Sequence, residues 1–266
     1  MNNPPDLYHI DFSRDSHSSL EIFRRAIEEY AAVRVHRTIP PPAPTPAMLF
    51  GAAFHTYVLE PEKFRQYYVI PPSFDRRTTV GKIAAAAWDT THGDLLSITQ
   101  EDMNLMAGML AGLGRNKFAA AVIAGEGTIE TPIEWTDEQT GTPLKCRPDK
   151  VLKNGLIVDL KTCVDIEPGD FARAVANFGY HRQAALYLEG CKTIGAEGPF
   201  LFIAVSKRPP HETVCYTLDY AALELGNSQN LLTLAELAER RLKADWSGRW
   251  GNRIETLSLP RWALLE

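Results

Sequence analysis

The sequence predicts a mixed α/β fold (α/β or α+β), in which a mixed β-sheet is flanked by helices on both faces. Helical periodicity dominates the first part of the chain, and a run of short strands separated by turns follows. Helices then alternate with apolar strands up to about residue 245. We expect a single domain over 1–266, with a helical part over about 1–125 and a sheet core over about 126–245.

Capping signals predict two helices near the start of the chain. Ser18, followed three residues later by Glu21, predicts a capping box for the first helix. Thr45 and Pro46 predict the N-cap and the first residue of the second, and a proline-rich connector joins the two helices. The elements expected in this part are helices over 18–36 and 46–59, a short strand at 66–70, a helix over 80–88, and one or two helices over 99–124.

Alternation and turn residues predict the elements of the second part. Three strands separated by turn-rich segments are followed by two helices, two strands and one long helix, and the chain after this helix is expected to be irregular. In order, the predicted elements are strands over 128–135, 144–152 and 155–162, helices over 171–178 and 181–190, strands over 200–206 and 213–219, and a helix over 220–245.

Composition excludes several classes of protein. The net charge of −5 argues against a protein that coats nucleic acid over its whole surface, but it is compatible with a local acidic metal site. The four cysteines are widely spaced and match neither a zinc site nor an iron–sulfur site, so we expect reduced thiols. No stretch has the apolar length of a membrane span, and the first residues do not resemble a signal peptide. We expect a cytoplasmic protein with no membrane partner.

The segment RPDKVLKNGLIVDLKT contains the strongest chemical signal. It puts Asp149 on one strand and both Asp159 and Lys161 on the next. Because side chains alternate along a strand, Asp159 and Lys161 share a face. Carboxylate oxygens suit Mg²⁺ or Mn²⁺, and an ammonium group can stabilise charge that develops on a phosphate. Taken alone, this pattern is more often a surface ion pair.

The register of this hairpin decides whether the two acids can meet. A two-residue loop, Asn154-Gly155, would place Asp149 opposite Leu160 and on the wrong face. A three-residue loop that begins at Lys153, with Gly155 in the left-handed conformation, places Asp149 opposite Asp159 instead. A shared metal site therefore predicts the longer, bulged loop.

The pair Pro148-Asp149, followed by Asp159-Leu160-Lys161, resembles the motif of the PD-(D/E)XK nuclease superfamily, which has a restriction-endonuclease-like core. Further segments are similar to the nuclease domain of the RecE (exodeoxyribonuclease VIII) family, and the similarity spans nearly the whole chain. They are the GAAFH segment at 51–55, the pair Gln183 and Tyr187, the RRTTVGK segment at 76–82 and the closing LPRW.

His55 also fits a metal site on its own chemistry, because it lies one helical turn from Gly51, whose missing side chain leaves room for a metal or phosphate. The resemblance implies a ligand set for one or two Mg²⁺ (or Mn²⁺) ions: His55, Asp149, Asp159 and the main-chain carbonyl of Leu160. It implies that Lys161 is catalytic together with the two aspartates, and that Gln183 and Tyr187 orient the site or contact the DNA backbone.

The resemblance further implies a 5′→3′ exonuclease acting on double-stranded DNA ends, as a ring-shaped homo-oligomer beside a single-strand annealing protein. A DNA endonuclease of the same superfamily and a catalytically silent DNA-binding or scaffold protein are the alternatives. Other charged residues are expected to be solvated, although some could contact phosphates or, for the two glutamates, approach the metal: Arg76, Lys82, Glu130, Glu134, Lys150, Arg173, Arg182, Lys207 and Arg208.

Overall fold

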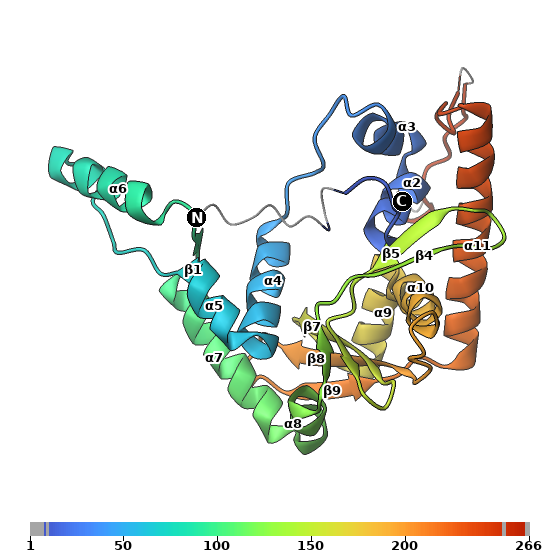
Figure 1. Cartoon of the computed structure of the whole chain (residues 1–266). Coiled ribbons are helices and arrows are strands. Elements are labelled where there is room, and N and C mark those ends of the chain that lie inside the picture. Colours follow the sequence, from blue (N-terminus) through green and yellow to red (C-terminus); the bar gives the residue numbers. More distant parts are fainter. Residues whose placement is uncertain (1–7, 9–10, 252–253, 264–266) are drawn as a thin grey trace.

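The computed structural model describes residue 8 and residues 11–251 and 254–263. Its centre is a five-stranded mixed sheet in the order β3-β6-β7-β8-β9 (Figure 1). Strands β7 and β8 are parallel and the other neighbours are antiparallel. The five strands are β3 (Gly127–Ile129), β6 (Lys150–Leu152), β7 (Ile157–Cys163), β8 (Phe200–Ser206) and β9 (Thr213–Tyr216). The predicted mixed sheet flanked by helices is confirmed.

Two smaller sheets lie outside the central one. Strands β4 (Ile133–Thr136) and β5 (Pro143–Cys146) pair antiparallel, and β1 (Tyr68–Val69) pairs parallel with β2 (Leu96–Ser97). The β1–β2 pair is the base of an excursion that carries α6 (Thr79–His92), which projects away from the body in Figure 1.

Helices cover both faces of the central sheet, because β8 is buried along its whole length and its side chains alternate between two cores. One core contains residues from α4 (Pro46–Leu59), α5 (Pro61–Tyr67), α7 (Gln100–Arg115) and α8 (Lys117–Ala124). The other contains residues from α2 (His17–Arg25), α3 (Ile27–Tyr30), α9 (Pro168–Phe178), α10 (Tyr180–Lys192) and α11 (Tyr220–Lys243). The site described below lies where these two layers meet.

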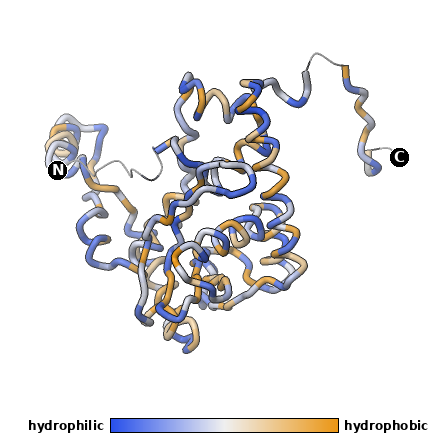
Figure 2. The backbone as a smooth tube through the Cα atoms, turned by 45° about the vertical axis from the view of Figure 1, so that its right-hand side comes forward, coloured by the Kyte–Doolittle hydropathy of each residue, from blue (hydrophilic) through white to orange (hydrophobic). Residues whose placement is uncertain are grey.

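The chain after α11 is irregular apart from a short 3₁₀ helix, Arg261–Ala263. In Figure 2 its described part, 254–263, lies away from the body, in agreement with the full exposure of Ile254. None of the helices that the structure describes is long and apolar enough to cross a bilayer.

The first predicted helix is wrong in its start and in its continuity. Its N-cap is Ser16, not Ser18, and the capping box pairs Ser16 with Ser19. Ser19, and not Glu21, is the second residue of the capping box because its buried hydroxyl also donates to Asp15 Oδ1 at 2.8 Å. The helix then breaks at Ala26, which is extended, before α3 and a π-helix (Ala31–Val35) follow.

The second predicted helix is confirmed, with Thr45 as its N-cap and Pro46 as its first residue. The region over 99–124 forms two helices, α7 and α8. The strand predicted over 128–135 is instead two strands, β3 and β4, because the chain turns at Glu130, whose φ is +47°.

The predicted three-residue hairpin loop is confirmed. Leu152 N–H donates to the Leu156 carbonyl at 2.9 Å, which leaves 153–155 as the loop, and Gly155 has φ +85°. Lys150 pairs with Val158, so the next position toward the N-terminus, Asp149, is level with Asp159.

A buried ionic cluster around Asp15 joins the two ends of the fold. Asp15 is fully buried and lies 3.1 Å from Arg34 Nε, while Arg241 of α11 pairs with its other oxygen. Tyr30 donates its hydroxyl to the same carboxylate at 3.0 Å. One buried carboxylate, that of Asp15, therefore binds the side chains of Ser19, Tyr30 and both arginines.

We predict that Asp15→Ala lowers the free energy of unfolding by about 3–5 kcal/mol, because it leaves two guanidinium groups without their buried partner. Urea denaturation would measure this. The matched control is Asp170→Ala, which removes an exposed partner of Arg173 and should cost less than about 1 kcal/mol. Equal effects of the two substitutions would contradict the role given to Asp15.

Candidate metal centre

The site forms at the point where β6 and β7 stop pairing. The β6–β7 ladder ends at Lys150, and the next available donor on β7 is the Leu160 N–H. Asp149 accepts this N–H through its side chain, with Oδ2 at 2.6 Å. The carboxylate of Asp149 thus takes the position of a ladder acceptor, which fixes its orientation without any bound ion.

Two residues from other elements approach the same carboxylate. His55 of α4 has its Nδ1 3.4 Å from Asp149 Oδ1. Glu130 follows β3, and its N–H donates to the Asp149 carbonyl at 3.2 Å. One ligand atom each of His55, Glu130 and Asp149 can be chosen so that all lie within 4.8 Å of one another, a spacing suited to one metal ion.

Glu130 was expected to face solvent, but the structure places it in the cluster with His55 and Asp149. Its side chain is about one-quarter exposed and pairs with Arg147 at 3.1 Å. Its left-handed backbone is uncommon for a residue other than glycine, asparagine or aspartate, and such strain is frequent at functional sites. Pro132, two residues later, was the available signal that the strand breaks here.

Asp159 and Lys161 form an adjoining group with α10. Asp159 is buried, and its Oδ2 lies 2.7 Å from Lys161 Nζ. Gln183 contacts both residues: its Nε2 donates to Asp159 Oδ1 at 2.9 Å, and its Oε1 accepts from Lys161 Nζ at 3.1 Å. The Lys161 ammonium also lies 4.3 Å from the centre of the Tyr180 ring. The buried hydroxyl of Tyr187 interacts with Gln183.

Asp159 does not lie in the same cluster as His55 and Asp149, contrary to the convergence expected of the three. Its oxygens are directed to Lys161 and Gln183 instead, because α10 covers that face of β7. For Leu160 the structure shows the N–H bonded to Asp149, and the role of its carbonyl as a metal ligand stays a prediction. Glu130 takes the place in the cluster that was expected for Asp159.

The electrostatics of the site favour additional positive charge. Burial lowers the pKa of His55, but the Asp149 carboxylate outweighs burial and raises this pKa to about 9. Burial raises the pKa of Asp159 to about 6, and burial together with Asp149 raises the pKa of Glu130 to about 7. Three carboxylates are thus held close together, and two of them resist ionisation in the absence of a further cation.

A divalent ion fits this donor set. Two carboxylates and one imidazole suit Mg²⁺ or Mn²⁺ better than a soft, sulfur-preferring metal. Asp159 Oδ2 is buried and receives no hydrogen bond from the described residues, despite its ion pair with Lys161. The predicted open space at Gly51 is also present, since a Cβ there would meet only Thr162 Oγ1, at 4.0 Å.

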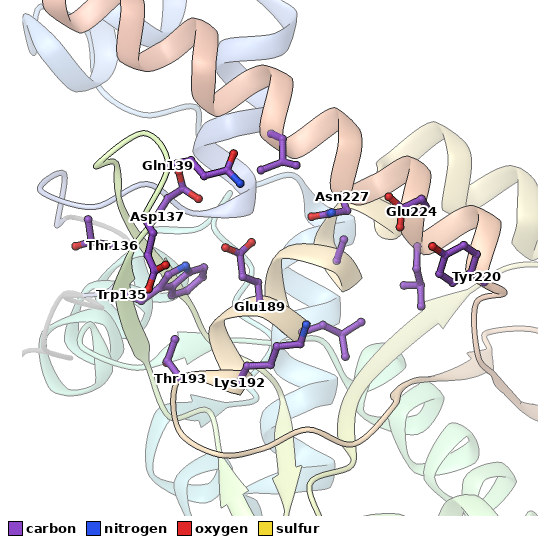
Figure 3. A pocket seen from close by; sticks show the side chains of 15 residues that line it. Trp135, Thr136, Asp137, Gln139, Glu189, Lys192, Thr193, Tyr220, Glu224 and Asn227 are labelled. Atoms are coloured by element: carbon purple, nitrogen blue, oxygen red, sulfur yellow. The ribbon is translucent and has the colours of Figure 1, made fainter.

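A cavity in the described part of the chain lies elsewhere. About 590 Å³ in volume, it lies between β4, α10 and α11 and is lined by Trp135, Glu189, Lys192 and Tyr220 among others (Figure 3). Glu189 and Lys192 lie on the side of α10 opposite to Gln183. The cavity includes none of the candidate site residues, so the metal centre is identified by its chemistry and not by its volume.

Comparison with known proteins finds a matching family model and solved structures that resemble the chain. The family model described as "PDDEXK-like domain of unknown function (DUF3799)" matches residues 16–253. A solved structure from Eubacterium rectale, named "Putative exonuclease", is similar over 100% of this chain and 98% of that chain, with 14% identity and a TM-score of 0.66, and thus shares the fold.

A second solved structure, SSO0001, is 14% identical over 74% of this chain and 87% of that chain. Its TM-score of 0.30 is too low to support an argument. No curated protein matches the sequence.

We predict that Mg²⁺ or Mn²⁺ raises the melting temperature by about 5 °C at ion concentrations near 100 times Kd, because binding to the folded state alone stabilises it. Asp149→Asn should abolish the shift and Glu130→Gln should reduce it, as measured by thermal denaturation with and without the ion. Asp170→Asn, on the exposed surface of α9, is the control and should keep the wild-type shift. A full shift in Glu130→Gln would remove Glu130 from the ligand set.

Proposed function

Because the chain belongs to this PDDEXK-like family, we propose that it is a divalent-metal-dependent nuclease that hydrolyses the phosphodiester bonds of DNA. The observation that carries the proposal is the His55–Glu130–Asp149 cluster beside the Asp159–Lys161 pair. One face of this arrangement can hold a cation, and the other presents a fixed ammonium group. That combination suits an anionic substrate that must gain charge during the reaction.

His55, Glu130 and Asp149 would hold the ion, and Asp159, level with Asp149 on the neighbouring strand, would contribute a carboxylate to a second ion. A bound divalent ion would lower the pKa of a water molecule and neutralise charge on the scissile phosphate. The Leu160 N–H keeps the Asp149 carboxylate aimed at the cluster.

Lys161 would act as a fixed positive charge and not as a base. Burial lowers its pKa, but Asp159, Tyr180 and Asp149 outweigh burial and raise the pKa above its usual value. The ammonium group therefore stays protonated near neutral pH and can stabilise a phosphate oxygen as its charge develops. Gln183 positions both members of the Asp159–Lys161 pair, and Tyr187 supports Gln183 from one turn further along α10.

In its finer form the proposal is an exonuclease that digests linear double-stranded DNA in the 5′→3′ direction with Mg²⁺ or Mn²⁺. The RecE-like order of motifs along the chain supports this form, as it supports a ring-shaped homo-oligomer that works with a single-strand annealing protein in recombination. A ring would keep the enzyme on its substrate by topology, which is compatible with the net charge of −5.

We predict that Lys161→Ala lowers turnover at least a hundredfold, since loss of one charge contact in the transition state costs about 3 kcal/mol. Binding of linear duplex should change little; because buried Asp159 loses its ion-pair partner the melting temperature should fall, so turnover is compared well below it. Lys192→Ala, a lysine on the opposite side of α10, is the control and should cleave at the wild-type rate. EDTA should abolish cleavage by the wild type. Wild-type turnover in Lys161→Ala, or activity in chelator, would refute the mechanism.

A separate prediction concerns DNA ends. Linear duplex should be degraded to nucleotides or short fragments, while covalently closed circles of the same sequence should stay intact over the same time, as followed on agarose gels with Mg²⁺. Linearising the circle with a restriction enzyme should restore degradation. Rapid nicking of closed circles would instead favour an endonuclease.

A further inference from the structure

Lys207 lies at the same edge of the sheet as the metal centre but has no part in the chemistry proposed above. It directly follows β8, and its N–H donates to the Cys163 carbonyl at the end of β7, at 2.7 Å. Because β7 and β8 are parallel, their carboxyl ends meet at this edge. Cys163 lies two residues after Lys161 on β7, and the ammonium groups of Lys161 and Lys207 both act electrostatically on its thiol.

Lys207 also lacks the anionic partner that its neighbour has. Arg208 pairs with Asp165, whereas no carboxylate of the described residues lies within 4.0 Å of Lys207 Nζ. The ammonium instead lies 4.5 Å from the centre of the Phe50 ring on α4. Burial lowers the pKa of Lys207, which shows that its charge is partly dehydrated. Asp102 acts on this ammonium electrostatically but makes no ion pair with it, so a partly dehydrated cation with no carboxylate in contact remains available to bind an anion.

Space for such an anion exists beside the Phe50 ring. The next residue of α4 is Gly51, where an added Cβ would find Thr162 Oγ1, at 4.0 Å, as its only neighbour. The Thr162 hydroxyl has no hydrogen-bond partner among the described residues and is free to donate. Glycine inside a helix weakens it relative to alanine, and packing offers no reason for it here. The open backbone at Gly51 and the Thr162 hydroxyl are therefore neighbours, and Phe50, the residue before Gly51, contacts the Lys207 ammonium.

The loop that carries Lys207 is held in place by its own contacts. Ser206 Oγ accepts from Arg208 N–H at 3.1 Å, and Ser206 N–H donates to the Glu212 carbonyl at 2.9 Å. The His211 ring packs against α7 where Gly108 has no side chain. The start of the Lys207 side chain is thus fixed before substrate arrives, which lowers the entropy cost of binding.

We propose that Lys207, the Thr162 hydroxyl and the bare backbone at Gly51 bind a DNA phosphate next to the scissile one. Gly51 and His55 are four residues apart on α4, a rise of about 6 Å, so this group and the metal centre can hold neighbouring phosphates of one strand. Lys207 then sets which phosphodiester bond reaches the metal. The inference rests on the proposed function and adds to it how the strand is positioned.

The test is equilibrium binding of a fluorescently labelled linear DNA duplex by Lys207→Gln over a range of salt concentrations, with Ca²⁺ in place of Mg²⁺. We expect Kd to rise about three- to tenfold and the slope of log Kd against log salt to fall by about 0.7–0.9, as for the loss of one phosphate contact. In cleavage assays with Mg²⁺, KM should rise with little change in kcat. Lys192→Gln, with the same charge change on the far side of α10, should match the wild type.

Gly51→Ala separates binding from folding. The added methyl group fits without a clash, so its melting temperature should equal or exceed that of the wild type. Its affinity for DNA should nevertheless fall, because the methyl group occupies the space for the phosphate. Wild-type affinity and salt slope in both Lys207→Gln and Gly51→Ala would overturn the inference while the wild type still cleaves DNA. A wild type that neither binds nor cleaves DNA would instead refute the proposed function.

Discussion

The arrangement of the candidate metal centre depends on one hydrogen bond, the one from the Leu160 N–H to the Asp149 carboxylate. It forms because β6 begins only at Lys150 and so supplies no backbone acceptor to the Leu160 N–H of β7. A buried N–H needs a partner, and here a charged side chain provides it. The carboxylate is then committed to one orientation, and His55 and Glu130 approach its free side. A regular ladder at this position would leave the site without its central acid.

Two helices on opposite faces of the sheet contribute to the site in different ways. The α4 helix provides His55 for the cation and, one turn earlier, the open backbone at Gly51. The α10 helix provides Gln183, whose amide nitrogen donates to Asp159 and whose amide oxygen accepts from Lys161. The candidate site therefore takes residues from helices on both faces of the sheet.

Local signals in the sequence were sufficient for much of this structure. Thr45 and Pro46 start α4 as expected, and the loop ending at Gly155 has the predicted length because its left-handed residue is a glycine. The Asp149–Asp159 register followed from that loop alone. What could not be predicted depends on contacts distant in sequence. The first capping box moved to Ser16 because Ser19 bonds a buried aspartate, and Glu130 joined the site through pairing of β3 with β6.

The side-chain direction of Asp159 was also beyond prediction from the sequence. The alternation of side chains along a strand gives the face of the sheet on which Asp159 lies. Whether its carboxylate faces the metal-ligand cluster or Lys161 depends on how α10 packs. Glu130 was a comparable case, since a strained backbone has no clear sequence signature apart from the nearby Pro132. For both residues the sequence indicated only the part of the fold in which they lie. The packing of segments distant in sequence determined which partners they contact.

The buried cluster around Asp15 has a consequence for how the protein is made. Its carboxylate is shared by Arg34, which is synthesised soon after it, and Arg241, which is separated from it by 226 positions. During synthesis the N-terminal helices therefore emerge from the ribosome with half of their counter-charge still missing. They cannot close over Asp15 until nearly all of α11 has been translated. The core that supports α10 and its Gln183 is completed at the same moment, so a nascent chain would acquire this site only after α11 has been made.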